Sequence, residues 1–210
     1  MTVSTDDIVR RAARLLMAGT RLDLGRMAAE LGISRTTFFR RVGNRDDLMG
    51  AALRRLSDRT WQRALDGWRA EHGDAVRTPD GRLRCLWVME AYRREVAGSD
   101  GLRKLIEAEP TVALRVLTDP RGAVQPGLVD AHVDLFRADA DAAGLAPLVG
   151  LPDLAFAVVR LGESFLYSDF LVARSVDLAV VTTLVDTLAG GALAPVAERP
   201  PGPFPSVRPL

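Results

Sequence analysis

Apolar residues recur every three to four positions along most of the 210-residue chain, and no segment alternates strictly between apolar and polar residues over more than a few positions. This spacing is typical of amphipathic helices and not of half-buried strands. We therefore predict an all-α protein. The predicted helices cover residues 5–18, 24–31, 34–42, 46–70, 83–97, 101–109, 111–118, 128–143, 152–173 and 176–188.

Capping residues and glycines mark the ends of the first helices. Thr5 is a suitable N-cap for the first helix, because two aspartates follow it and negative charge stabilises a helix N-terminus. Asp23 is the predicted N-cap of the second helix, which ends before Gly32, and Ser34 is the predicted N-cap of the third.

Residues 27–39 fit a helix-turn-helix on steric grounds. Ala28 is small enough for two helices to cross closely, and Gly32 can adopt a positive φ at the corner. The first turn after Ser34 then exposes side chains that a DNA major groove would meet. These side chains are Arg35, Thr36 and Thr37. A helical hairpin that binds no DNA has the same local pattern.

Charge is unevenly distributed along the chain. Residues 1–60 hold 12 arginines and seven acidic residues, a net charge of +5, whereas residues 61–210 carry a net charge of −4. Positive charge near the helix-turn-helix favours an interaction with the phosphates of DNA.

Several classes of protein are excluded by composition. One cysteine, Cys85, and two histidines cannot supply a disulfide or a four-thiolate zinc site, so we expect neither metal nor cofactor. The longest uncharged stretches have 11 residues, too few to cross a membrane, and the first helix is charged where a signal peptide would be apolar. We expect a cytoplasmic protein without a membrane partner.

Catalytic motifs are also missing. Gly162-Glu163-Ser164 lacks the second glycine of a nucleophile elbow, and there is no glycine-rich phosphate loop. Cys85 and His132 could lie together in space, but their neighbours do not suggest an activated nucleophile. We expect no catalytic residues and no enzyme, although a helical enzyme remains an alternative.

Two groups of residues carry a family resemblance. One is Ala28, Gly32, Ile33 and Ser34; the other is Phe39 followed by Arg45-Asp46-Asp47-Leu48. With these motifs, residues 5–55 resemble the DNA-binding domain of TetR-family transcriptional regulators. Phe39, Arg41 and Val42 depart from the tyrosine, histidine and phenylalanine that are usual in the family.

The resemblance implies a set of DNA contacts. Arg45 is expected to bind a phosphate, and Arg40 or Arg41 replaces the contact of the missing tyrosine hydroxyl. The expected DNA-binding residues are Ser34, Arg35, Thr36, Thr37, Phe39, Arg40, Arg41 and Arg45.

The segments 87–92 and 161–165 resemble the QsdR-like subgroup of the family, which regulates the degradation of quorum-signal lactones. The family resemblance implies a DNA-binding domain over residues 1–46 and a helical ligand-binding and dimerisation domain over residues 47–190. Residues 191–210 contain six prolines and are expected to form a disordered tail.

A homodimer and a small apolar effector follow from the same resemblance. The dimer would bind a near-palindromic operator in double-stranded DNA and, as a repressor, be released by the effector. The last two helices have more apolar surface than one core needs, which predicts a dimer interface there. The predicted interface residues are Phe165, Phe170, Leu184, Val185 and Leu188.

The middle helices are the expected place for the effector. The candidate pocket residues are Trp87, Glu90, Tyr92, His132, Phe136, Glu163 and Tyr167. Their aromatic members suit an apolar core equally well, and we expect His132 to be a core or pocket-lining residue. A DNA-binding dimer without an effector is the other alternative, and a cavity among these helices would argue against it.

Overall fold

A computed structural model of the chain describes residues 3–171 and 177–195, except the side chains of residues 168–171 and 194–195. It confirms the all-α prediction. The helices are α1 (Thr5–Met17), α2 (Leu24–Glu30), α3 (Arg35–Val42), α4 (Arg45–His72), α5 (Arg84–Ala97), α6 (Asp100–Ala108), α7 (Pro110–Thr118), α8 (Val124–Ala143), α9 (Leu151–Leu171) and α10 (Leu178–Ala192).

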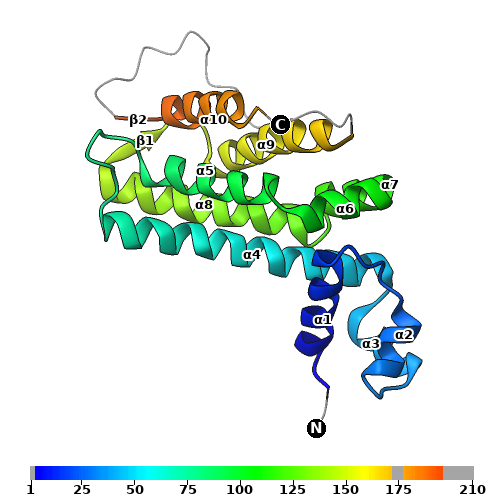
Figure 1. The fold of residues 1–210 in the computed structure, drawn as a ribbon. Coiled ribbons are helices and arrows are strands. Elements are labelled where there is room, and N and C mark those ends of the chain that lie inside the picture. The colour runs from blue at the N-terminus through cyan, green and yellow to red at the C-terminus, as the bar shows by residue number, and fades with distance from the viewer. Residues whose placement is uncertain (1–2, 172–176, 196–210) are drawn as a thin grey trace, which may run out of the picture.

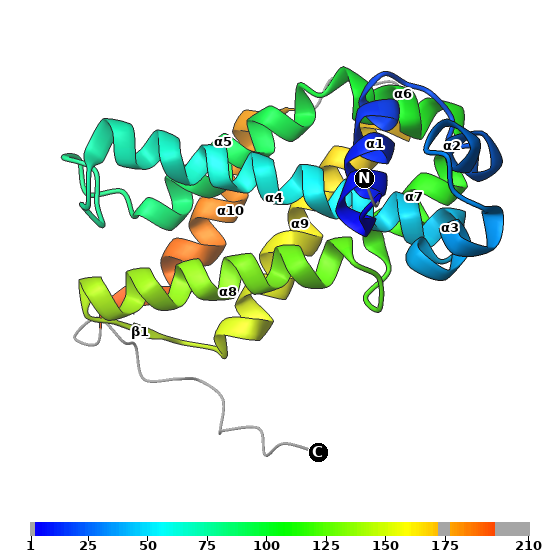
Figure 2. The same ribbon diagram turned by 90° about the horizontal axis from the view of Figure 1, so that it is seen from below.

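The helices form a small N-terminal unit and a larger bundle (Figure 1). Helices α1–α3 lie together at one end of the long α4, and α6 and α7 lie beside that end (Figures 1 and 2). Helices α5 and α8 pack on α4, and α9 and α10 form the layer on the far side of the bundle from α4.

Side chains that the sequence-based prediction did not identify cap the starts of two helices. The N-cap of α1 is Ser4 and not Thr5: the Ser4 hydroxyl accepts a hydrogen bond from the Asp7 amide, and the Asp7 carboxylate accepts one from the Ser4 amide. Helix α4 begins at Arg45 because the Asn44 side chain caps it. In both cases the capping side chain and the residue three positions later satisfy each other's backbone donors.

Residues 191–195, which we expected to belong to a disordered tail, are structured. Helix α10 continues to Ala192, and β2 (Leu193–Pro195) pairs antiparallel with β1 (Leu145–Pro147), which lies between two of the predicted helices. Leu193 is buried in the core of the bundle, which stabilises this pairing. Residues 196–210 lie outside the described residues.

Two apolar cores hold the helices together. One lies within the bundle, where Trp68, Met89 and Phe136 are buried. The other joins the N-terminal unit to α6, α7 and the start of α8, and includes Phe38 of α3 and Ile106 of α6. Because protein cores are closely packed, the N-terminal unit cannot move independently of α6 and α7.

A buried carboxylate supports the start of α5. Leu83 provides no side-chain cap, and the Asp139 carboxylate of α8 accepts the Cys85 amide proton at 2.6 Å instead. The other carboxylate oxygen accepts a hydrogen bond from Arg84 Nε at 2.7 Å. Asp139 is fully buried, so it acts as a cap supplied by a different helix.

His132 is a buried residue of the bundle. Its ring centroid lies 4.6 Å from that of Trp61 and 6.0 Å from that of Phe136. Nδ1 lies 2.8 Å from the Leu128 carbonyl oxygen and therefore carries the ring proton that this hydrogen bond requires. Burial lowers the pKa of His132 to about 4, so the ring is neutral at pH 7.

Asp139→Ala should lower the free energy of unfolding by about 1–3 kcal/mol, because it leaves the Cys85 amide buried without a partner. Asp134→Ala is the matched control, since Asp134 lies on the same helix and its carboxylate is exposed. Urea unfolding of both variants measures the difference, and equal stabilities would contradict the capping role of Asp139.

Lowering the pH should destabilise the protein through His132. The unfolded chain protonates this histidine near pH 6.5, whereas the folded protein keeps it neutral down to about pH 4. The contribution of His132 to stability is therefore lost as the pH falls through this window, by about 2 kcal/mol at pH 5. Urea unfolding at pH 8 and pH 5 should show that this loss is absent in His132→Gln. The same loss of stability between pH 8 and pH 5 in both proteins would contradict the assignment of this loss to His132.

Candidate functional site

Helices α2 and α3 form the helix-turn-helix that the sequence predicts. Gly32 adopts a φ of +66° at the corner, and Ala28 is buried where the two helices meet. The Ser34 hydroxyl accepts a hydrogen bond from the Thr37 amide at 3.2 Å and so caps α3. Phe38 is fully buried, which fixes the side of α3 that faces outward.

The outward side of α3 carries free positive charge. Arg35 and Arg40 are exposed, and among the described residues neither of them forms an ion pair. Thr36 is also exposed, and the Phe39 ring is 46% exposed beside them. An exposed aromatic ring among unpaired arginines is a suitable surface for a DNA groove and its phosphates.

Two predicted DNA-binding arginines point inward. Arg41 donates a hydrogen bond from Nη1 to the Val3 carbonyl oxygen. Arg45 forms two hydrogen bonds with the Glu109 carboxylate, at 2.7 and 2.5 Å, and a third with the Leu22 carbonyl oxygen. In this structure Arg45 is therefore engaged within the subunit, and its expected contact with a phosphate stays a prediction. Its partner Glu109 is 64 positions away, so local sequence gave no signal of this pairing.

Two adjoining cavities lie among the middle helices. Tyr92, Val96, Leu128, Glu163 and Tyr167 line both of them. The volume that the centre of a water molecule can occupy is about 50 Å³ in the first cavity and about 140 Å³ in the second. One water needs roughly 10–15 Å³ on this measure, so the second cavity has room for a small organic molecule.

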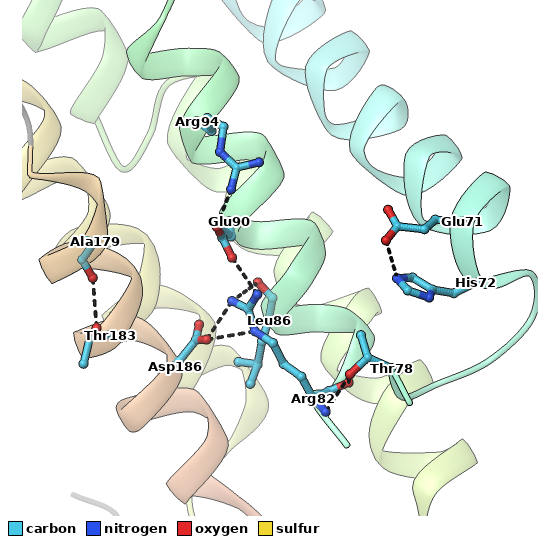
Figure 3. A network of polar contacts seen from close by, with 10 residues as sticks. All are labelled: Glu71, His72, Thr78, Arg82, Leu86, Glu90, Arg94, Ala179, Thr183 and Asp186. Atoms are coloured by element: carbon cyan, nitrogen blue, oxygen red, sulfur yellow. Dashed lines mark hydrogen bonds and ion pairs between the residues drawn. The ribbon is translucent and has the colours of Figure 1, made fainter. Parts of the chain in front are cut away.

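The predicted pocket residues divide into two groups. Tyr92, His132, Glu163 and Tyr167 line the first cavity. The other three predicted residues do not line these two cavities, and each of them contacts other groups. Phe136 is fully buried in the bundle core, Trp87 packs against Trp68, and Glu90 forms ion pairs with Arg82 and Arg94 (Figure 3).

The polar groups of the cavity wall are mostly satisfied. Glu163 accepts hydrogen bonds from Gln125 at 3.0 Å and from Arg160 at 2.9 Å, and burial raises its pKa. The Tyr92 hydroxyl lies 2.8 Å from that of Ser57, and burial raises the pKa of Tyr92 to about 12. Burial also raises the pKa of Tyr167, so both phenols stay protonated.

The second cavity extends to the N-terminal unit. Leu16 and Met17 at the end of α1 line it together with Gly101 and Leu105 of α6. A Cβ atom at Gly101 would lie only 2.7 Å from the Met17 Cα, so α6 approaches the backbone of α1 more closely than any larger residue permits. Sequence reasoning missed these residues, because nothing in their local pattern indicates which helix they face.

Helix α10 presents an uncharged, exposed stripe. Val180, Leu184 and Leu188 are 45%, 43% and 39% exposed and are spaced by four residues. The Thr183 and Thr187 hydroxyls on the same side are bonded to carbonyl oxygens of their own helix. Among the described residues, this stripe is apolar surface without a partner.

The other predicted interface residues differ in their exposure. Val185 is fully buried in the subunit core, so its prediction as an interface residue is wrong. It lies one position from Leu184, and 100° of helical rotation turns it to the opposite side. Phe165 is half-buried, and the side chain of Phe170 lies outside the described residues.

The described residues give little evidence for a metal site, a nucleophilic thiol or a membrane span. It contains no group of three or more histidine, cysteine or acidic side chains that could hold a metal ion. Burial raises the pKa of the Cys85 thiol well above its ordinary value, which disfavours a nucleophilic thiolate. Of the helices in residues 3–171 and 177–195, none is both long and apolar enough to span a membrane.

Comparison with known proteins identifies the family. Residues 80–190 match the family described as the tetracyclin repressor-like, C-terminal domain. The structure of the R. erythropolis transcriptional repressor QsdR, from the TetR family, is similar with a TM-score of 0.76. The similarity extends over 89% of this chain and 94% of that chain, at 26% sequence identity. A search of curated proteins gave no significant match. The chain therefore belongs to the TetR family and is a DNA-binding transcriptional regulator, not an enzyme.

Proposed function

We propose that the chain is a repressor that binds a near-palindromic operator as a homodimer and is released by a small effector with an apolar part. In this proposal residues 1–46 bind DNA, and residues 47–190 bind the effector and form the dimer. The observation that carries it is the second cavity, which contacts α1 and α6 while α1 shares a core with the DNA-binding helices.

Helix α3 is the proposed recognition helix. Arg35 lies in its first turn, where a side chain can reach base edges, and a guanidinium group pairs with guanine through two hydrogen bonds. Arg40 lies near the end of α3 and is assigned to a phosphate, as are the hydroxyls of Ser34, Thr36 and Thr37. Phe39 contributes apolar contact. Arg41 and Arg45 are assigned to holding the N-terminal unit, because both are engaged within the subunit.

The α10 stripe is the proposed centre of the dimer interface. A two-fold axis beside α10 would bury Val180, Leu184 and Leu188 of both subunits against each other. Phe156 of α9 is also exposed and can extend the apolar area. Helix α10 itself lies on the far side of the bundle from α4 (Figure 1).

Effector binding is coupled to DNA binding through α6 in this proposal. A molecule in the second cavity displaces α6 or Met17, because Gly101 and Met17 leave no free space between their backbones. Two ion pairs connect the first turn of α4 with the α6–α7 region: Arg45 with Glu109, and Asp46 with Arg115 at 2.5 Å. A shift of α6 therefore changes the orientation of the N-terminal unit and the distance between the two recognition helices.

Arg35→Ala should weaken binding to the preferred operator by about 1–3 kcal/mol and flatten the base preference at one position. Fluorescence anisotropy with the operator and with a random duplex measures both effects. Arg40→Ala is the control, because loss of a phosphate contact weakens the two duplexes alike. If Arg35→Ala also weakened both equally, Arg35 would not read a base.

Leu184→Asp should convert the dimer into a monomer, because a carboxylate would be buried in the interface without a partner. Gln62→Asp is the control, since it adds the same charge to the exposed side of α4. Sedimentation velocity at micromolar concentration should give a dimer for the wild type and for the control. A monomeric wild type, or a dimeric Leu184→Asp, would contradict the proposed interface.

A further inference from the structure

The wall of the first cavity contains a guanidinium group without a partner. Arg93 of α5 lines this cavity, and its Nε and Nη2 atoms are buried with no hydrogen-bond partner among the described residues. Desolvation by the surrounding protein lowers the pKa of Arg93 to about 10, which still leaves it charged at pH 7. Buried donors without acceptors destabilise a fold, so such a group calls for an explanation.

Two carboxylates that attract Arg93 electrostatically, Glu90 and Asp186, are bound to other arginines, and Figure 3 shows these pairs. Glu90 binds Arg82 through Oε2 at 2.6 Å and Arg94 through Oε1. Asp186 of α10 accepts two hydrogen bonds from Arg82 on Oδ2, at 3.0 and 2.6 Å. Three guanidinium groups thus share two carboxylates, and the positive charge that remains belongs to Arg93. Asp186 Oδ1 is buried without a hydrogen bond and, within residues 3–171 and 177–195, is the acceptor that could compete for Arg93.

The rest of the cavity suits an apolar chain that carries an anionic group. Its wall includes apolar side chains of α8, α9 and α10, such as Leu128, Val158 and Val181. Glu163 is the acidic residue of the wall, and its carboxylate is already bonded to Gln125 and Arg160. The second cavity adjoins the first and continues along Leu53 and Leu105 towards α1.

We propose that the first cavity binds the carboxylate of an aliphatic monocarboxylic acid, with Arg93 as its counter-ion and the apolar chain extending into the second cavity. Charge-assisted hydrogen bonds between guanidinium and carboxylate are among the strongest that a protein can make. The ligand supplies the acceptors that the empty site lacks. This inference rests on the proposed function only for its regulatory meaning, because it names the chemical class of the effector.

Ligand binding without DNA tests this assignment. Hexanoate, octanoate and decanoate are titrated into the full chain by isothermal titration calorimetry, with 1-hexanol, 1-octanol and 1-decanol as neutral counterparts. At least one carboxylate should bind more tightly than the alcohol of the same length. Arg93→Gln should weaken carboxylate binding by roughly tenfold or more, the loss expected for a hydrogen bond to a charged group, and leave alcohol binding unchanged.

A control variant and a stability measurement make the test specific. Arg69→Gln removes the same charge from an exposed site on α4, outside this group of arginines, and should leave carboxylate binding unchanged. The thermal midpoint of Arg93→Gln should stay equal or rise, because the substitution removes a buried group with unpaired donors. A fall in the midpoint would assign Arg93 to a structural pair with Asp186 and overturn the proposal.

Two binding results would also overturn it: no binding by any of the carboxylates, or an equal loss of carboxylate and alcohol binding in Arg93→Gln. Since the titration contains no DNA, either result leaves the proposed DNA binding standing. Conversely, a chain that binds octanoate through Arg93 but binds no duplex would refute the proposed function and not the ligand assignment.

Discussion

The apolar core that α1–α4 share with α6, α7 and the start of α8 is the interaction on which the rest of the structure depends. Phe38 of the proposed recognition helix and Ile106 of α6 belong to this core, although they lie far apart in the sequence. A DNA-binding unit on a flexible linker would not respond to a ligand in a distant cavity. Because this core is continuous, a displacement of α6 reaches the recognition helix through packed side chains.

Arginine residues have two different roles in the N-terminal unit. Arg35 and Arg40 remain unpaired on the surface of α3, where they are available to a polyanion. Arg45 is bound to Glu109, so its charge is used to connect α4 with the α6–α7 junction. An ion pair of this kind contributes little net stability once desolvation is included, but it fixes the relative orientation of the elements it joins. The same residue type therefore serves recognition at one place and coupling at another.

Sequence alone predicted the helices and the corner of the helix-turn-helix, because these depend on local spacing and on single residues such as Gly32 and Ser34. Four of the seven predicted cavity residues line a cavity, since the apolar helices of the bundle were recognisable. Contacts between distant segments could not be predicted from the sequence. The Arg45–Glu109 pair, the Asp139 cap on α5 and the close approach of Gly101 to Met17 all join residues more than 50 positions apart. The prediction of Val185 at the interface failed because a shift of one residue on a helix changes the side it faces.

The shared core predicts a property of the DNA site, the separation of its half-sites, that can be measured directly. Together with the bundle core that holds α10, it fixes each recognition helix relative to the α10 stripe of its own subunit. Without effector, the proposed dimer should therefore accept only one separation between half-sites. Selection of binding sites for the full chain from a pool of random duplexes tests this rigidity. The expected result is an inverted repeat whose half-site centres are separated by one constant distance, roughly 10 base pairs or a small multiple of it. Half-sites enriched at many different separations, or no enriched sequence at all, would contradict a recognition unit held rigidly by that core.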